Sequence, residues 1–302
     1  MIEVPGALRR NAVAAWGEQG RRWLAELPES VADVCRSWGL ELGEPYALSF
    51  HWVARVRRDD GTAAVLKLGP PESDDLRREA LALGAYGGDG AVRLLARDPG
   101  RGAVLLERAE PGRMVRELVP RRDADATAAT VDVLRRLHAA DVVDGLPDVA
   151  TLGADFARHL GADHGRGPLP RVLVERAAEL LGDLCASAER RVVLHGDLHH
   201  DNVLRHGDGW VAIDPHGAVG DPGFDVGPPL YNPDPDRVDG ELLALVPARV
   251  EQLADGLGIA LDRASAWGFV AAVLSEVWDA EGGASDGGRA LRVAELLVRR
   301  LD

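Results

Sequence analysis

The chain has 302 residues, and its 35 basic and 49 acidic side chains leave a formal net charge of −14. With 46% hydrophobic and 28% charged residues it can bury a core, which excludes disordered and low-complexity proteins. The negative charge disfavours nucleic acid and anionic membranes as partners and favours a cationic small molecule.

The location expected from the sequence is the cytoplasm. The only cysteines are Cys35 and Cys185, so no disulfide framework is expected. The opening segment lacks the uninterrupted apolar run of a secretory signal, and no stretch approaches the roughly 18 apolar residues of a membrane span. We therefore expect a cytoplasmic protein without a membrane partner, either a monomer or a weak dimer.

The first half of the chain mixes helix and strand patterns. Apolar residues at helical spacing predict two helices within the first 40 residues. From Tyr46 the apolar period changes to about two, and the turn Asp59-Asp60-Gly61 predicts a β-hairpin. A helix over 73–86, with Ser73 as its N-cap, and two short strands over 91–97 and 103–109 complete this half.

The rest of the chain is mostly helical in pattern. Amphipathic segments lie near 124–140, 152–160, 172–188, 240–256, 263–281 and 289–301. One strand–loop–strand pattern interrupts them between Arg191 and Trp210. The sequence thus predicts an α+β protein with an antiparallel-sheet lobe over 1–107 and a mostly helical lobe over 108–302.

The densest polar cluster lies in the loop of that strand–loop–strand unit. It reads HGDLHHDN from His195 to Asn202, and the second strand ends at Asp214. The hairpin geometry places Asp197, Asn202 and Asp214 within reach of one another. Carboxylate and amide oxygens are ligands suited to Mg²⁺, and a carboxylate beside the metal can accept the proton of an attacking hydroxyl.

These motifs resemble those of the aminoglycoside phosphotransferase family, whose members are relatives of the protein kinases. The run VLHGDLHHDNVL followed by WVAIDPHGAVGDPGFD is similar to the streptomycin 6-phosphotransferase and hydroxyurea phosphotransferase branch. VPGAL, GRRWLAELP and DGTAAVLKL extend the likeness over essentially the whole chain. The resemblance implies a bilobal kinase-like fold that uses ATP and Mg²⁺, with Asp197 as catalytic base and Asn202 and Asp214 as metal ligands.

The resemblance also implies a nucleotide site in the N-terminal lobe. Lys67, the only lysine among 35 basic residues, would reach the α- and β-phosphates, and Glu79 on the following helix would pair with it. The hairpin over the phosphates lacks the G-x-G-x-x-G motif, which leaves the backbone amides near Ser49 and Phe50 as phosphate contacts.

Adenine would bind main-chain groups of the interlobe strand from Glu107 to Ala109. Four apolar side chains are candidate walls for it: Leu66, Leu106, Leu204 and Ile213. Asp221, Asp225 and His195 are interpreted as residues that hold the catalytic loop in shape. Four side chains are candidates for acceptor binding, because acidic groups of the C-terminal lobe could receive a cationic acceptor: His216, Glu276, Trp278 and Asp279.

The function that the resemblance implies is ATP- and Mg²⁺-dependent phosphorylation of a hydroxyl on a small antibiotic, streptomycin first, which would confer resistance. Hydroxyurea and an endogenous amino sugar remain alternative acceptors. Two readings from other classes remain as well: a nucleotide-binding pseudokinase, and a metal site built from the histidines crowded between His195 and His216. The histidine reading lacks an HExxH motif or a cysteine cluster.

Overall fold

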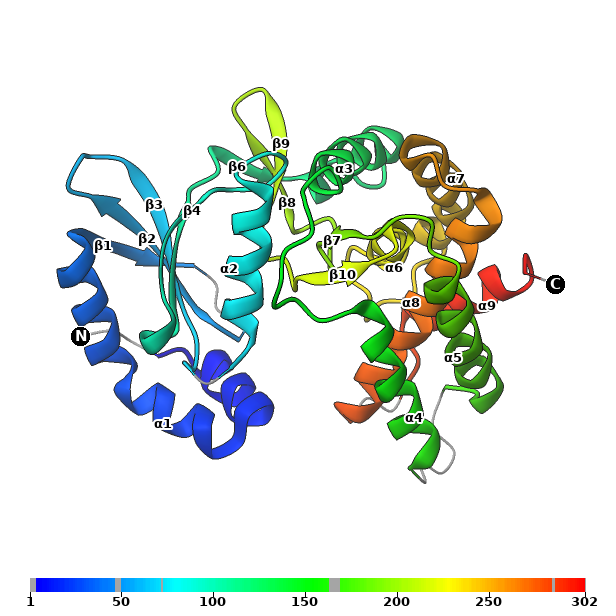
Figure 1. The fold of residues 1–302 in the computed structure, drawn as a ribbon, viewed down its shortest axis with the longest axis horizontal. Coiled ribbons are helices and arrows are strands. Elements are labelled where there is room, and N and C mark those ends of the chain that lie inside the picture. The colour runs from blue at the N-terminus through cyan, green and yellow to red at the C-terminus, as the bar shows by residue number, and fades with distance from the viewer. Residues whose placement is uncertain (1–3, 47–49, 72, 163–168, 284–285, 302) are drawn as a thin grey trace. The chain divides into compact units, whose positions relative to one another are not determined.

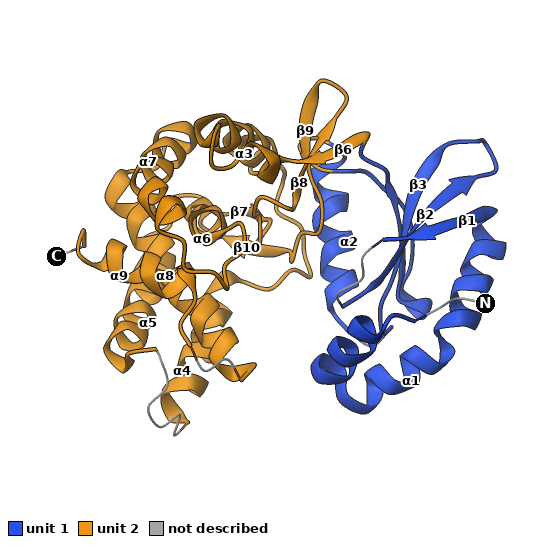
Figure 2. Cartoon of the chain, turned by 180° about the vertical axis from the view of Figure 1, so that it is seen from behind, with its two compact units in different colours: residues 1–88, 92–109 blue, residues 89–91, 110–302 orange. Residues whose placement is uncertain are grey.

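The computed structural model describes residues 4–46, 50–71, 73–162, 169–283 and 286–301. The chain forms two compact units, one of residues 1–88 and 92–109 and the other of residues 89–91 and 110–302 (Figure 2). The first unit is built on an antiparallel sheet and the second is mostly helical (Figure 1). The α+β fold class predicted from the sequence is therefore confirmed.

The first unit is organised around a five-stranded antiparallel sheet with the order β1-β2-β3-β5-β4. Its strands are β1 Leu40–Pro45, β2 Trp52–Arg58, β3 Ala63–Leu68, β4 Leu94–Asp98 and β5 Ala103–Glu107. The predicted hairpin corresponds to β2 and β3, which pair in register from Trp52 with Leu68 to Arg57 with Ala63. This register fixes which side chains of β3 face the core.

Helices α1 (Gly6–Trp38) and α2 (Asp75–Tyr86) flank this sheet (Figure 2). The buried side chains of α1 form one apolar cluster with alternate residues of the strands, including Leu66 and Leu68 of β3. The two helices predicted for this region are the two halves of α1. They meet at Gly17, whose φ of +54° and ψ of −124° break the helical path.

Strand β1 was not predicted from the sequence. Only Leu40 of its six residues is buried, so the strand shows no alternation of apolar and polar side chains. It is an edge strand, and its pairing with β2 is what orders it. The whole segment from Tyr46 to His51, where the sequence predicts a strand to begin, lies outside any strand or outside the described residues.

The second unit contains most of the helices: α3 Asp123–Leu137, α4 Gly153–Gly161, α5 Arg171–Ala186, α6 Pro228–Tyr231, α7 Gly240–Leu257, α8 Leu261–Glu281 and α9 Arg289–Val298. Over 264–274 helix α8 is buried on every side, which identifies it as the central helix of the unit. Two small sheets accompany the helices. One pairs β7 (Val192–Leu194) with β10 (Ala218–Gly220), and the other has the order β6-β8-β9, formed by Pro111–Met114, Val203–His206 and Gly209–Ala212.

Among the described residues, no single helix is both long and apolar enough to cross a membrane. Helices α7 and α8 meet that criterion only when taken together, as a pair bent by 120°.

Candidate active site

The loop that carries Asp197 is held in shape by a buried carboxylate. Asp225 Oδ2 accepts a hydrogen bond from the His195 main-chain N–H at 3.0 Å, and Oδ1 accepts one from the Gly196 N–H at 2.8 Å. Burial by itself raises the pKa of Asp225, but the hydrogen bond and charge of His138, 2.9 Å away, keep this pKa below its ordinary value. Asp225 is thus ionised, and its carboxylate holds the main chain at the start of the loop.

His195 is also engaged by the main chain. Its Nδ1 accepts a hydrogen bond from the Asp197 N–H at 3.2 Å, so its Nε2 carries the proton and donates to the Ile213 carbonyl at 2.9 Å. Burial lowers the pKa of His195 to about 4, which keeps the ring neutral. Both ring nitrogens of His195 are therefore engaged in hydrogen bonds with main-chain groups.

The Asp197 side chain lies among other charged and titratable groups. Its Oδ2 is 3.6 Å from His199 Nε2 and 3.7 Å from His216 Nε2. Burial, and then the negative charges of Asp214 and Asp225, raise the pKa of Asp197 to about 8. A carboxylate with a raised pKa is a stronger proton acceptor, which suits a group that removes a proton from a hydroxyl.

We expect Asp214→Asn to lower the pKa of Asp197 toward its ordinary value, because the substitution removes a neighbouring negative charge. Carboxyl ¹³C NMR titration of the metal-free protein measures this pKa directly. Asp208→Asn, which changes an exposed carboxylate on the β8–β9 turn, is the matched control and leaves the pKa unchanged. An Asp197 pKa that is identical in both variants would contradict the assigned cause.

Asn202 and Asp214 are brought together by the main chain. The Ile213 N–H donates to the Asn202 carbonyl at 3.0 Å, which places the next residue, Asp214, beside Asn202. Asp214 has a φ of +63°, a left-handed conformation that is uncommon outside glycine and is tolerated best by Asn and Asp. Such a backbone conformation is found often at functional sites, and it is consistent with the role predicted for Asp214.

The donor set of these two residues fits Mg²⁺. Asn202 Nδ2 donates to the Asp197 carbonyl at 3.0 Å, and this bond orients the side-chain amide so that Oδ1 is its remaining acceptor. Asp214 adds carboxylate oxygens on an exposed side chain. A divalent cation would also relieve the repulsion between the Asp197 and Asp214 carboxylates.

The histidines of this region do not form a metal site of their own in the described part of the chain. No group of three or more His, Cys, Asp or Glu side chains there is placed to hold a metal ion. His199 lies near Asp197, whereas the adjacent His200 is buried and burial lowers its pKa well below the ordinary value. The histidine-based alternative gains no support from this geometry.

In the first unit, Lys67 and Glu79 form a buried ion pair. The period of two along β3 places Lys67 on the face opposite to Leu66 and Leu68, which pack with α1. Helix α2 supplies Glu79, whose Oε2 lies 2.7 Å from Lys67 Nζ. The two side chains are only 6% and 4% exposed, so each charge depends on the other for its stability.

The other predicted nucleotide contacts are less defined. Ser49 lies outside the described residues, and the Phe50 side chain is exposed. Glu107 bonds with Arg93 twice, through its main-chain N–H and through its carboxylate. Within the described residues the main chain of Ala109 makes no hydrogen bond, which leaves its N–H and C=O available to a ligand.

The three residues of α8 that were predicted to bind the acceptor have different surroundings. Glu276 is buried and accepts hydrogen bonds from the N–H groups of Gly288 and Leu291, at the start of α9, so it supports the fold. Trp278 donates its indole N–H to Asp155 at 3.1 Å. The residue Asp279 is exposed overall, but partial desolvation of its carboxylate, and then the charge of Asp236, raise its pKa.

Glu276→Ala should destabilise the protein by about 1–3 kcal/mol, because it leaves buried N–H groups of Gly288 and Leu291 without acceptors. The free energy of unfolding in urea measures this loss. Glu295→Ala, on the part-exposed face of α9, is the control and should change stability little. Unchanged stability together with a raised acceptor KM would return Glu276 to the acceptor site.

Arg116 was not singled out in the sequence. Its guanidinium donates to Asp201, in the loop that carries Asp197, at 2.9 Å and to both carboxylate oxygens of Asp234 at 2.9 Å. Asp201 and Asp234 lie 85 and 118 positions after Arg116 in the chain, so no local sequence pattern could have predicted these contacts. Arg116 thereby links the loop that carries Asp197 to the segment 229–237.

Two buried arginines hold the main chain of this segment, which we call the 229–237 segment. Arg249 donates to the carbonyls of Pro229 and Asn232 at 2.8 and 2.7 Å. Arg289 donates to the carbonyls of Tyr231 and Arg237 at 3.2 and 2.7 Å and also to that of Pro233. These bonds anchor the backbone of the segment at several points.

Tyr231 of this segment lies within electrostatic range of both Asp197 and Asp279. Burial of its hydroxyl, and then the charges of these two residues, raise the pKa of Tyr231.

Comparison with known proteins identifies relatives along most of the chain. The family described as aminoglycoside/hydroxyurea antibiotic resistance kinase matches residues 41–283. Streptomycin 6-kinase of Streptomyces griseus is 33% identical over 288 residues, which are 93% of this chain and 92% of that protein. Hydroxyurea phosphotransferase of Kitasatospora aureofaciens is 33% identical over 310 residues, which cover 99% of this chain and 87% of the relative.

Solved structures match the fold at low sequence identity. A thermostable mutant of an aminoglycoside phosphotransferase, in ternary complex with ADP and hygromycin B, aligns with a TM-score of 0.63 at 14% identity, over 89% of this chain and 97% of that one. A choline/ethanolamine kinase family protein from Mesorhizobium loti aligns with a TM-score of 0.62 at 16% identity, over 92% and 93% of the two chains. These likenesses establish a kinase-like fold.

Proposed function

Because the chain belongs to the aminoglycoside/hydroxyurea antibiotic resistance kinase family, we propose that it transfers the γ-phosphate of ATP to a hydroxyl of streptomycin or a related cationic aminoglycoside. Phosphate transfer to a hydroxyl is the chemistry of the family. ATP as donor, Mg²⁺ as cofactor and streptomycin as acceptor are the specific content of the proposal. Phosphorylation would alter the drug's fit to its target and so confer resistance. We place the reaction in the cytoplasm, where ATP is supplied.

Asp197 carries the proposal. Its carboxylate, with a pKa raised to about 8 and a loop backbone fixed by Asp225, would orient the acceptor hydroxyl and take its proton. The hydroxyl oxygen forms a bond to the γ-phosphorus while the bond from that phosphorus to the β–γ bridging oxygen breaks and ADP leaves. Asp197 then releases the proton to water, which restores the base.

The remaining residues hold the nucleotide. Asn202 and Asp214 would bind Mg²⁺, which when bound neutralises charge on the triphosphate. Lys67, oriented by Glu79, would pair with the α- and β-phosphates, and main-chain groups of Glu107 and Ala109 would bind adenine.

Charge favours a cationic acceptor. The chain carries a net charge of −14, and Asp236 and Asp279 lie close enough for the first to raise the pKa of the second. A guanidinium or ammonium group would relieve the repulsion between such carboxylates. His216, with a side chain that is 64% exposed beside Asp197, is placed to meet the acceptor near the reacting hydroxyl.

Hydroxyurea is the second candidate acceptor, because the similarity to hydroxyurea phosphotransferase spans 99% of the chain. The decisive experiment incubates the protein with ATP and Mg²⁺ and, in turn, streptomycin, other aminoglycosides and hydroxyurea. It follows ADP release and identifies the phosphorylated product by mass spectrometry. We expect the largest kcat/KM with streptomycin. A larger value with hydroxyurea would replace the proposed acceptor, and ADP release that no acceptor stimulates would contradict the proposal.

A further inference from the structure

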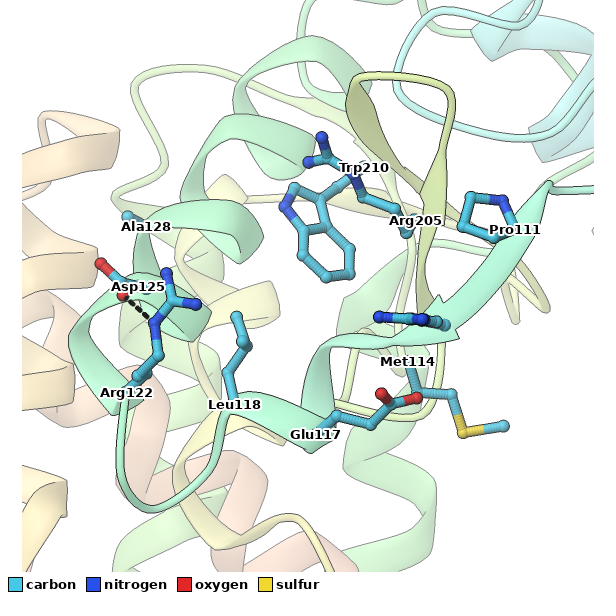
Figure 3. A pocket seen from close by; sticks show the side chains of 10 residues that line it. Pro111, Met114, Glu117, Leu118, Arg122, Asp125, Ala128, Arg205 and Trp210 are labelled. Atoms are coloured by element: carbon cyan, nitrogen blue, oxygen red, sulfur yellow. Dashed lines mark hydrogen bonds and ion pairs between the residues drawn. The ribbon is translucent and has the colours of Figure 1, made fainter.

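A cavity of about 510 Å³ lies on the second unit, against the sheet β6-β8-β9 (Figure 3). A cavity of this size is within the range of small-molecule sites. The side chains that matter for its chemistry come from β6, from the segment before α3 and from the β8–β9 hairpin: Pro111, Arg113, Glu117, Leu118, Arg205 and Trp210.

The cavity lies on a different face of the sheet from the proposed nucleotide wall. Arg205 and Trp210 are cross-strand partners, so their side chains share one face. Leu204 precedes Arg205 on β8 and therefore points to the opposite face, the one that we assign to adenine. The cavity is thus separate from the groups assigned to phosphate transfer.

The charged side chains at the cavity favour a ligand with one negative charge. Arg122 and Asp125 form an ion pair at 2.7 Å and neutralise each other. In the part of the chain that the structure describes, neither Arg113 nor Arg205 has a carboxylate within ion-pair distance, although the chain has 49 acidic residues. Two arginines and Glu117 give a net local charge of one positive unit, which complements a monoanion.

The apolar side chains at the cavity favour a flat ring. Trp210 presents a half-buried indole, and the Arg205 guanidinium carbon lies 5.5 Å from the centroid of that ring. Leu118 and Pro111 line other sides of the same hollow, as Figure 3 shows. A planar ligand ring beside the indole would bury apolar surface. An acidic substituent on that ring would lie within reach of the Arg205 guanidinium.

We propose that this cavity binds a small aromatic carboxylate, with its ring beside Trp210 and its carboxylate between Arg113 and Arg205. The ligand class follows from the net charge, the half-buried indole of Trp210 and the volume of the cavity. The site is independent of phosphate transfer, so it can be tested without an acceptor or an activity assay.

The test uses 2-naphthoate as the probe and the indole N–H signal of Trp210 in ¹H–¹⁵N NMR spectra as the readout, with Trp210→Phe to assign that signal. We expect 2-naphthoate to shift the signal and 2-naphthylmethylamine, its cationic counterpart, to leave it unchanged. The shift should persist with saturating Mg²⁺ and ADP.

Two variants and one control locate the carboxylate. Arg113→Gln and Arg205→Gln should each weaken 2-naphthoate binding about tenfold or more, because each removes a charge-assisted hydrogen bond to the carboxylate. Arg121→Gln changes an exposed arginine that does not line the cavity and should leave the affinity unchanged. The proposal is overturned if the naphthoate does not shift the signal, if the amine binds equally well, or if ADP displaces the naphthoate.

Discussion

Replacement of Asp197 by Asn is expected to lower kcat by about 10²–10⁴-fold, because the amide cannot take the proton of the acceptor hydroxyl. Nucleotide affinity should remain nearly intact, since Asn202 and Asp214 keep their oxygens. Steady-state kinetics with streptomycin and calorimetric titration with ADP and Mg²⁺ separate the two effects. Turnover close to that of the unchanged protein would remove Asp197 as the base.

The same substitution should raise stability at alkaline pH. The folded protein holds the Asp197 proton up to a pKa of about 8, whereas an unfolded chain releases it at about pH 4. The folded state therefore binds the proton more tightly, and the stability of the unchanged protein relative to Asp197→Asn falls as pH rises between these values. Thermal unfolding at pH 5 and pH 9 measures this, and an equal Tm difference at both pH values would contradict the raised pKa.

The second large effect is expected at the buried ion pair. Lys67→Met should destabilise the first unit by about 3–5 kcal/mol, because the Glu79 carboxylate loses the ammonium that offsets its burial. The KM for ATP should rise about tenfold or more, as the proposed phosphate contact is lost. Urea unfolding and initial-rate kinetics measure the two changes.

The double variant Lys67→Met/Glu79→Leu distinguishes stability from function. It removes both charges, so much of the lost stability should return. The KM for ATP should stay high, since no cation is restored. Recovery of a normal KM in the double variant would show that Lys67 acts only through the fold.

The parts of the fold and site that could be predicted from the sequence are those governed by local patterns. Asp59-Asp60-Gly61 indicates a hairpin through its turn chemistry, and the period of two along β3 places Lys67 away from the apolar cluster. The strand–loop–strand pattern around Asp197 likewise indicates where a polar loop meets the end of β9.

The features that could not be predicted depend on contacts between distant segments. Strand β1 has no apolar alternation, and only its partner β2 orders it. The sequence does not distinguish Glu276 from a solvent-exposed glutamate. In the structure, N–H groups at the start of α9 donate hydrogen bonds to its carboxylate. Arg116 is one of many arginines, and its partners come from segments that are remote in sequence.

The bonds from Arg249 and Arg289 to the 229–237 segment end on carbonyl oxygens, which every residue type possesses. These contacts therefore do not depend on which side chains the segment carries, whereas the bonds from Arg116 require the carboxylate of Asp234. Asp236, whose charge raises the pKa of Asp279, takes no part in these backbone contacts. Under the proposed function, a point substitution at Asp236 would therefore change the charge presented to the acceptor on an unchanged framework.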